Sequence, residues 1–310
     1  MSRPGEPGRV LHVLTGCTAV GKTEWALRWA EANGAEIISC DSLLFYRGMD
    51  IGTAKPSAAE LARVRHHLVD IRDVSEPMNA ALYAPMALAA AEDIRSRGRA
   101  VLVVGGSGFY LRSFFAPVAD EVHVPGEVRE RVAALLDTGG VAALAAELGR
   151  LNPAGLGGID LANPRRVAGA LGRCLASGRT LAELSADFAR ARAPFAGWDV
   201  RLARLERPGP ELEARIAARA DSMVRAGLVE EVGRLLGAGL LRNPSAARAI
   251  GYRETVEALA GRAPMGGLSA TITSDTRALV KKQRTWFRTQ LPPHAVHQAG
   301  LGDPARLFLG

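Results

Sequence analysis

The feature that most constrains the fold is a glycine-rich segment near the N-terminus, the sequence GCTAVGKT at residues 16–23. A short apolar run at residues 10–14 precedes it, and a helical pattern at residues 24–32 follows it. The glycines allow a backbone path that turns several N–H groups inward, where they and the helix N-terminus can hold phosphate oxygens. Because a P-loop requires strand, loop and helix in this order, the segment predicts a phosphate-binding loop.

Individual residues of this loop have distinct expected roles. We expect Lys22 to bring a mobile positive charge to the phosphates, and Thr23 to offer its hydroxyl to a divalent cation, Mg²⁺. Cys17 is expected to be an ordinary loop residue and not a nucleophile. The motif does not identify the phosphate compound, and ATP or GTP are the usual ligands of such a loop. The other predicted phosphate-binding positions are Gly16, Thr18, Ala19, Val20 and Gly21.

Alternating strands and helices predict an α/β fold with a parallel sheet that is covered on both faces. The further strands are predicted at residues 36–40, 100–104 and 200–205, and a helix is predicted at residues 80–96. Asp41 and Ser107 each follow one of these strands. Since ligands of open α/β sheets bind at the carboxyl ends of the strands, we expect both side chains to lie near the phosphate loop.

The composition changes after Pro117, where the chain becomes rich in Ala, Leu and Arg and loses its strand signals. We interpret residues 120–199 as an all-helical insertion. The P-loop NTPase-like core is then formed by residues 1–119 and 200–310. Residues 211–237 are predicted to form a long helical region of this core, and residues 274–290 a basic amphipathic terminal helix.

Composition limits the class of protein. The net charge of +7 and the pI of about 9.8 weakly favour a polyanionic partner. Three cysteines without metal-ligand spacing argue against a disulfide framework. The polar residues 1–9 lack an apolar signal-peptide core, and we expect no stretch to be long and apolar enough to span a membrane. A cytoplasmic enzyme is expected.

Several other residues carry two interpretations. Asp41 is a candidate general base or a ligand for metal-bound water, but a carboxylate there also suits an Asx-turn or a helix cap. Lys55 in the sequence DIGTAKP can contact phosphate or lie in a plain surface loop. Residues 66–70 (HHLVD) favour a structural role over a metal site. Arg215 and Arg219 share one helix face, which can clamp a diphosphate or be merely solvated.

Taken together, the motifs resemble those of the tRNA dimethylallyltransferases, also called tRNA isopentenyltransferases. The similarity runs in order through residues 10–290, and DIGTAKP is its most specific string. The matching segments are GCTAVGKT at 16–23, DS at 41–42, YRGMDIGTAKP at 46–56, HLVDI at 67–71, VGGSGFY at 104–110, NPRRV at 163–167, RIAAR at 215–219, GLVEEV at 227–232, AIGYR at 249–253 and KKQRTWFR at 281–288.

The resemblance implies an activity. Members transfer the dimethylallyl group from dimethylallyl diphosphate to the exocyclic N6 amine of adenosine at tRNA position 37, next to the anticodon. The P-loop and Arg215 would then hold the diphosphate of an isoprenoid. By resemblance, Asp41 is the general base. Ser107 stands where the family usually has Thr, and would hydrogen-bond the diphosphate or the reacting centre. Arg219 would neutralise the charge that develops on the bridging oxygen, together with Lys22 and with Mg²⁺ held by Thr23.

The family's helical insertion grips the anticodon stem-loop. A monomer is expected. The positions that align with tRNA contacts, or that form the basic terminal helix, are Asp41, Ser42, Leu43, Leu44, Ser107, Arg129, Arg165, Arg166, Arg248, Gly251, Tyr252, Arg253, Lys281 and Lys282. An equally open reading of residues 281–288 is an ordinary helix that buries Trp286 and Phe287.

The chain also departs from the family pattern. Cys17 and Val20 replace the usual Pro and Ser, Leu44 replaces a frequent Gln, and Gly169 and Gly172 replace a charged pair. These differences leave open an isopentenyltransferase that acts on free adenine nucleotides, and a tRNA-binding paralogue without catalysis. A small-molecule P-loop kinase is disfavoured by the basic tail and the helical insertion.

Overall fold

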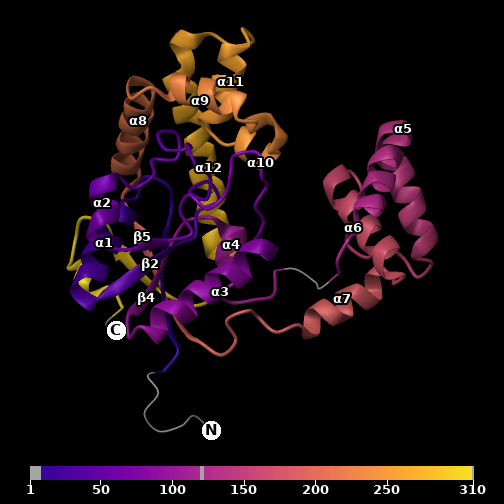
Figure 1. Ribbon diagram of the computed structural model, residues 1–310, viewed down its shortest axis with the longest axis horizontal. Coiled ribbons are helices and arrows are strands. Elements are labelled where there is room, and N and C mark those ends of the chain that lie inside the picture. Colours follow the sequence, from indigo (N-terminus) through magenta and orange to yellow (C-terminus); the bar gives the residue numbers. More distant parts are fainter. Residues whose placement is uncertain (1–7, 119–121, 309–310) are drawn as a thin grey trace. The chain divides into compact units, whose positions relative to one another are not determined.

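The computed structural model describes residues 8–118 and 122–308 (Figure 1). The chain divides into two compact units, one formed by Met1–Val118 with Ala193–Gly310 and the other by Ala119–Arg192. Residue 120, the predicted first residue of the insertion, lies outside the described residues.

The first unit contains a six-stranded sheet in which every pairing is parallel, with the order β3-β2-β4-β1-β5-β6. Its strands are β1 (Val10–Gly16), β2 (Ala35–Ser39), β3 (His66–His67), β4 (Ala100–Val104), β5 (Asp199–Glu206) and β6 (Ala295–Gln298). Four of them match the predicted strands and confirm the α/β class. The sequence did not predict β3, which has only two residues, or β6, which is a polar and mostly exposed edge strand.

Neighbouring residues of each central strand point to opposite faces of the sheet, and both faces are buried. In β1, Leu11 and Val13 pack into one hydrophobic cluster and Leu14 packs into another. Likewise Ile38 of β2 joins the first cluster and Ile37 the second. The apolar runs in the sequence reflect this burial on two sides.

Different helices cover the two faces. The second cluster includes residues of α1 (Lys22–Asn33), and the larger first cluster includes residues of most other helices of the unit. These are α3 (Ala80–Ser96), α4 (Gly108–Arg112), α8 (Gly209–Arg225), α9 (Leu228–Gly237), α10 (Pro244–Ala247), α11 (Tyr252–Leu259) and α12 (Leu268–Gln290). The short helix α2 (Ala58–Arg63) has no buried residues, and 3-10 turns lie at Leu240–Arg242, Met265–Gly267 and Pro304–Arg306. Figure 1 shows α8, α9 and α11 gathered beyond one end of the sheet, with α12 running from this group towards α4.

The helical region predicted for residues 211–237 is confirmed, and it consists of two helices, α8 and α9. Gly227 separates them with a φ of 100°, a left-handed conformation that ends one helix and precedes the next. An acidic side chain of α9, the helix that begins after this break, lies against residues 50–52.

The second unit is entirely helical within its described residues. It contains α5 (Gly126–Leu151), α6 (Pro164–Ser177) and α7 (Leu181–Arg190). Leu144 of α5, Leu171 of α6 and Leu184 of α7 share one hydrophobic cluster. Asn163 caps α6 by accepting a hydrogen bond from the N–H of Arg166, and Pro164 occupies the first turn.

The predicted end of the insertion at residue 199 extends too far, because residues 193–199 belong to the first unit. Phe195 is 1% exposed, and its ring lies 4.7 Å from that of Phe114 and 5.9 Å from that of Trp198. The aromatic side chains of this connection therefore anchor the chain in the core just before β5.

Contrary to the expectation from the sequence, one helix, α5, is long and apolar enough to cross a membrane by length and composition alone. Its backbone is not continuous, however, because Gly140 adopts a φ of 65° and a ψ of −167°. The helical segments on either side are each shorter than the roughly 20 residues that a membrane-spanning helix needs. Buried side chains of α5 instead pack against α6 and α7.

Replacing either of two glycines in the second unit by alanine is expected to change the free energy of unfolding, in opposite directions. Gly169 lies in α6 with open space where a Cβ would project, so Gly169→Ala is expected to raise the free energy of unfolding by about 0.5–1 kcal/mol. Gly140→Ala is expected to lower it by about 1–3 kcal/mol, since an Ala there is strained although it has room. Urea unfolding followed by circular dichroism measures both. Destabilisation by Gly169→Ala would contradict a regular helix at that position.

Candidate active site

The loop that joins β1 to α1 follows the path that the glycine pattern predicts. Gly16 and Gly21 have φ values of 150° and 106°, and Ala19 is a non-glycine residue with a φ of 62°. A Cβ on Gly16 would lie 2.6 Å from the carbonyl oxygen of Leu205 in β5. Glycine at position 16 is therefore required both by its backbone conformation and by the close approach of the neighbouring strand.

Lys22, the first residue of α1, folds back over this loop. Its Nζ donates hydrogen bonds to the carbonyl oxygens of Gly16 (3.0 Å) and Cys17 (2.9 Å). Burial lowers the pKa of Lys22 to about 8, and the negative charge of Asp41 partly opposes this shift. Burial also raises the pKa of the Cys17 thiol, which agrees with a structural and not a nucleophilic role.

Two arginines donate hydrogen bonds to carbonyl oxygens of this loop. Arg215 of α8 donates a hydrogen bond from Nε to the carbonyl oxygen of Ala19 (2.9 Å), and Arg207 does the same to Val20 (3.1 Å). A Cβ on Gly21 would lie 3.4 Å from an Nη of Arg207 and 3.9 Å from an Nη of Arg215. The sequence suggested Arg215 but missed Arg207, whose only signal was its place immediately after β5.

A second residue that sequence reasoning missed is Gln283 of α12. Its Oε1 accepts a hydrogen bond from the backbone N–H of Thr18 (3.0 Å), and its Nε2 donates one to the carbonyl oxygen of Gly106 (3.1 Å). Gln283 thus joins the phosphate loop to the turn that follows β4. The only signal for it was its position among the basic residues of KKQRTWFR.

The ends of β1, β2 and β4 meet closely. A Cβ on Gly105 would lie 1.9 Å from the carbonyl oxygen of Cys40, at the end of β2. A Cβ on Gly106 would lie 2.9 Å from the carbonyl oxygen of Gly16 and 3.5 Å from Nζ of Lys22. The glycines after β4 therefore allow three strand ends and the lysine to share a small space.

Asp41 and Ser107 lie at this junction. Ser107 Oγ accepts a hydrogen bond from the backbone N–H of Ser42 (3.1 Å) and donates one to Ser42 Oγ (3.2 Å). Asp41 Oδ1 accepts a hydrogen bond from the N–H of Leu43 (3.0 Å), which is the Asx-turn foreseen as one interpretation. The turn fixes the half-buried carboxylate through one oxygen. Asp41 acts electrostatically on both Lys22 and Arg219.

Arg219 approaches from α8. Its Nη2 donates a hydrogen bond to the carbonyl oxygen of Thr53 (3.0 Å), in the DIGTAKP segment. Burial lowers the pKa of Arg219, and Asp41 opposes this shift while Arg215 adds to it. The two arginines of one helix face are thus both directed to the site, and neither is merely solvated.

Lys55 of the same segment has a structural role. Its Nζ donates hydrogen bonds to the carbonyl oxygen of Tyr46 (3.0 Å) and to Asp50 Oδ1 (2.6 Å), and it also forms an ion pair with Asp70. Its side chain is only 5% exposed. Lys55 therefore ties the loop together, and its charge is already balanced by two carboxylates.

The histidines of residues 66–70 form a strand. His67 Nε2 lies 2.7 Å from Oε2 of the buried Glu36, whose pKa is lowered to about 2 chiefly by a hydrogen bond from Arg97. Among residues 8–118 and 122–308, no group of three or more His, Cys, Asp or Glu side chains is placed to hold a metal ion.

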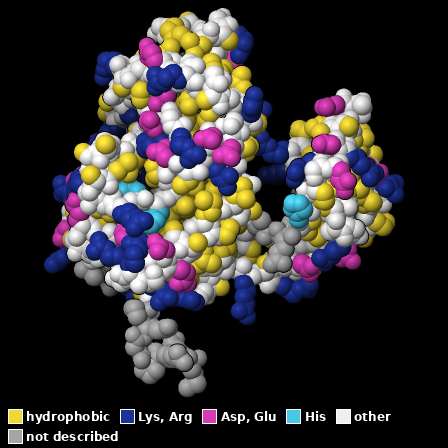
Figure 2. Space-filling view, in the orientation of Figure 1, with side chains coloured by type: hydrophobic (Ala, Val, Ile, Leu, Met, Phe, Trp, Pro, Cys, Tyr) yellow, Lys and Arg dark blue, Asp and Glu magenta, His cyan; other side chains and the backbone are white. Residues whose placement is uncertain are grey.

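The predicted tRNA-binding positions differ in accessibility. Seven are exposed, and Asp41, Ser42, Leu43, Leu44 and Ser107 are half-buried; the exposed ones are Arg129, Arg165, Arg166, Arg248, Arg253, Lys281 and Lys282. Figure 2 shows basic side chains scattered over the visible face of each unit with acidic ones among them. The positive charge on this face is therefore dispersed within each unit.

The burial of Tyr252 contradicts its predicted role as a tRNA-contacting side chain. Its side chain is fully buried, and its hydroxyl donates a hydrogen bond to Glu231 Oε1 (2.6 Å). Gly251 is buried as well and has a φ of 93° at the start of α11. Both residues shape the backbone behind the surface and neither offers a side chain to RNA. Phe287 is also buried at 1% exposure, which supports the reading of α12 as a packed helix.

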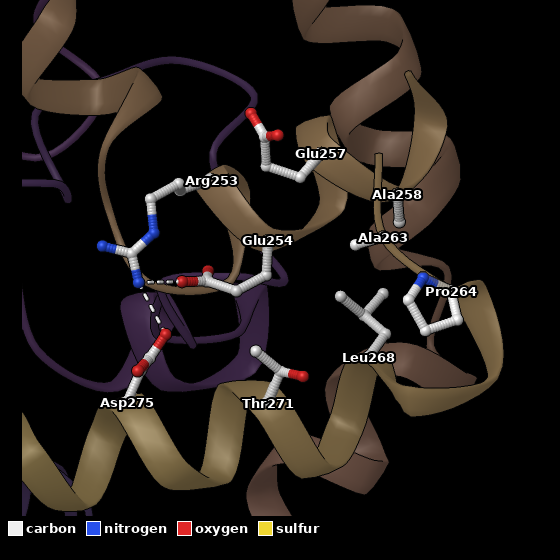
Figure 3. A pocket seen from close by; sticks show the side chains of 9 residues that line it. All are labelled: Arg253, Glu254, Glu257, Ala258, Ala263, Pro264, Leu268, Thr271 and Asp275. Atoms are coloured by element: carbon white, nitrogen blue, oxygen red, sulfur yellow. Dashed lines mark hydrogen bonds and ion pairs between the residues drawn. The ribbon is translucent and has the colours of Figure 1, made fainter. Parts of the chain in front are cut away.

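Arg253 lies at the edge of a pocket between α11 and α12 (Figure 3). Its Nη2 forms ion pairs with Glu254 and with Asp275, the latter at 2.6 Å. The pocket is otherwise lined mainly by small and apolar side chains. Because Arg253 is already paired with two carboxylates, its attraction for a tRNA phosphate is weaker than that of an unpaired arginine.

The fold and the site define a P-loop-like α/β protein in which the carboxylate of Asp41 interacts with the cations of Lys22 and Arg219. Comparison with known proteins gives the family. Residues 44–290 match the family of IPP transferases. The tRNA dimethylallyltransferase of Opitutus terrae is 66% identical over 299 residues, which cover 96% of each chain. The chain belongs to the IPP transferase family.

Solved structures agree with this assignment. The tRNA isopentenylpyrophosphate transferase of Bacillus halodurans is 30% identical with a TM-score of 0.69, and the match covers 96% of this chain and 93% of that one. A eukaryotic dimethylallyltransferase acting on tRNA has the same fold, with a TM-score of 0.81 at 22% identity over 94% of this chain and 74% of that one.

The lowered pKa of Lys22 predicts a pH dependence of anion binding. The lysine loses its proton as the pH rises through about 8, so affinity for inorganic diphosphate is expected to fall above that pH. Isothermal titration across pH 6–10 measures it. Lys22→Arg stays charged throughout and is the control for titration of the diphosphate itself. An identical decline of affinity in wild type and Lys22→Arg would show that deprotonation of Lys22 does not cause it.

Proposed function

We propose that this protein transfers the dimethylallyl group of dimethylallyl diphosphate to the N6 amine of adenosine 37 in tRNA. The observation that carries the proposal is the placement of Asp41 beside Lys22 and Arg219 at the carboxyl ends of the strands. One carboxylate among cations suits a reaction in which an amine loses a proton while a diphosphate leaves. Membership of the IPP transferase family supports the same reaction.

The donor would bind through its diphosphate. The N–H groups of residues 16–23 and the N-terminus of α1 provide neutral donors, and Lys22 adds a charge. Arg215 and Arg207 bind the carbonyl oxygens of Ala19 and Val20, which would leave N–H groups of the loop available to the ligand. Because Gln283 accepts from the N–H of Thr18, an arriving phosphate oxygen would compete with this amide.

The transfer balances as a displacement at carbon. The adenine N6 lone pair forms a bond to C1 of the dimethylallyl group while the C1–O bond breaks and diphosphate leaves with the electron pair. The N6 proton passes to the carboxylate of Asp41. Arg219 and Lys22 stabilise the charge that develops on the bridging oxygen, and Ser107 hydrogen-bonds the diphosphate or the reacting centre.

The donor set fits Mg²⁺, which prefers oxygen ligands, takes one or two from the protein and keeps several waters. The hydroxyl of Thr23 in the first turn of α1 would hold it, and the carboxylate of Asp41 is close enough to the loop to order its waters. When bound, the ion would neutralise part of the diphosphate charge.

The acceptor would be the anticodon stem-loop of tRNA, bound by the exposed basic residues. Arg129, Arg165 and Arg166 lie in the second unit, and Lys281 and Lys282 lie on α12 of the first. The target base must leave its stack to reach the site, which costs roughly a few kcal/mol and less in a loop than in a duplex. We further propose that the protein acts in the cytoplasm as a monomer.

Two other functions make different predictions. An isopentenyltransferase for free adenine nucleotides would modify AMP or ATP without tRNA, and a tRNA-binding paralogue would bind tRNA without turnover. The first measurement is therefore incubation with Mg²⁺ and labelled dimethylallyl diphosphate, with total tRNA, AMP or ATP in separate reactions. Label in tRNA alone supports the proposal, whereas label in a nucleotide or in none of them overturns it.

Asp41→Asn tests the general base. The Asn side-chain oxygen can still accept the N–H of Leu43, so the Asx-turn is kept while the proton acceptor is lost. We expect kcat to fall about 10²–10⁴-fold with little change in the affinity for diphosphate. Radiolabel transfer and diphosphate titration measure the two effects. Wild-type kcat in Asp41→Asn would exclude Asp41 as the base.

Salt dependence tests the RNA surface. If Arg165 and Arg166 contact phosphates, the slope of log K against log salt for tRNA binding should decrease by about 0.7–0.9 for each arginine replaced by Ala. Arg150→Ala is the matched control, since Arg150 is an exposed arginine of the same unit that is paired with Glu147. Equal slopes for all three variants and wild type would remove Arg165 and Arg166 from the interface.

A further inference from the structure

Glu231 of α9 is a buried carboxylate to which the proposed reaction assigns no role. It is 1% exposed, and its oxygens face the segment of residues 50–52. No Lys or Arg among the described residues forms an ion pair with it. A buried charge without a cation is costly unless several donors surround it, so its environment requires an explanation.

Backbone N–H groups supply that environment. Glu231 Oε2 accepts hydrogen bonds from the N–H groups of Asp50 (3.0 Å) and Ile51 (2.8 Å), and Oε1 accepts from Gly52 (3.2 Å) and from the hydroxyl of Tyr252 (2.6 Å). Three consecutive N–H groups converge on one carboxylate, as they do in an anion-binding nest. The carboxylate therefore fixes the backbone of residues 50–52 from within the protein.

The fit is tight around this contact. A Cβ on Gly52 would lie 2.5 Å from the ring of Tyr252, so only glycine lets the segment approach α11. Thr53 Oγ1 donates a hydrogen bond to the carbonyl oxygen of Met49 (2.7 Å), and the next residue, Ala54, has a φ of 48°. These features set the direction of the carbonyl group of Thr53, which immediately follows the three residues held by Glu231.

That carbonyl group is the contact of Arg219. Arg219 Nη2 donates to the Thr53 oxygen at 3.0 Å, which leaves most of its five N–H groups free for a ligand. We propose that Glu231 is a positioning residue for the transfer: through residues 50–53 it fixes the carbonyl oxygen that orients Arg219 towards the leaving diphosphate. This inference rests on the proposed function, because it assigns Arg219 to the leaving group.

Glu231→Gln tests the link. An amide keeps one oxygen acceptor but turns its NH₂ group towards backbone N–H groups, so it cannot hold all of residues 50–52. We expect kcat for transfer to fall about tenfold, with a smaller change in KM for dimethylallyl diphosphate, because Arg219 acts mainly in the transition state. Glu230→Gln is the matched control, since Glu230 is an exposed neighbour on the same helix, and it should retain wild-type kcat.

A double-mutant cycle separates positioning from general stability. In an Arg219→Met background, Glu231→Gln should change kcat less than about twofold, because the residue through which it acts is absent. Thermal unfolding of every variant shows whether it is folded at the assay temperature. If Glu231→Gln is not, Glu231→Asp, which keeps a carboxylate, takes its place in the cycle. Equal fold-losses in both backgrounds would overturn the inference.

Affinity for inorganic diphosphate, measured by titration of the same variants, does not depend on turnover. If wild type transfers no label but the two substitutions remain non-additive in diphosphate binding, the positioning role stands and the proposed function fails. If wild type transfers label, Arg219→Met slows transfer and Glu231→Gln is as active as wild type, the proposed function stands and the positioning role fails.

Discussion

The concentration of positive charge around one backbone loop is the constraint on which the site depends. Lys22, Arg207, Arg215 and Arg219 all lie within reach of the loop between β1 and α1 or of the segment beside it, and each donates to a backbone carbonyl oxygen. These contacts hold cations that would otherwise repel one another. They also give the carbonyl oxygens of Gly16, Cys17, Ala19 and Val20 cationic hydrogen-bond donors, which fixes the backbone of the loop.

The parallel sheet makes this arrangement possible. Because its strands run in one direction, the loops after β1, β2 and β4 all emerge at the same edge, and residues from positions 16, 41 and 106 come together. Gly105 and Gly106 permit the close approach. Side chains that are far apart in sequence therefore lie in one site. In this site the negative charge of Asp41 opposes the lowering of the pKa values of Lys22 and Arg219 by burial.

The sequence predicted the parts of this centre that follow from local pattern. Periodicity found the four longest strands, but one two-residue strand and a polar edge strand were missed, since neither has an apolar signal. The glycine spacing located the loop. Arg207 and Gln283 were not predicted, because their functions arise from hydrogen bonds across 187 and 265 residues of chain. Tyr252 was assigned to the surface because a motif does not reveal burial.

The burial of Glu231 could not be predicted from the sequence either. Its neighbour Glu230 is chemically identical and exposed, whereas Glu231 lies on the buried face of α9, the helix that begins after the turn at Gly227. Once inside, the carboxylate is stabilised by backbone donors and not by a cation, so its binding energy fixes a main-chain conformation. A helix break therefore determines the direction of one carbonyl group far earlier in the chain, and through it the orientation of Arg219.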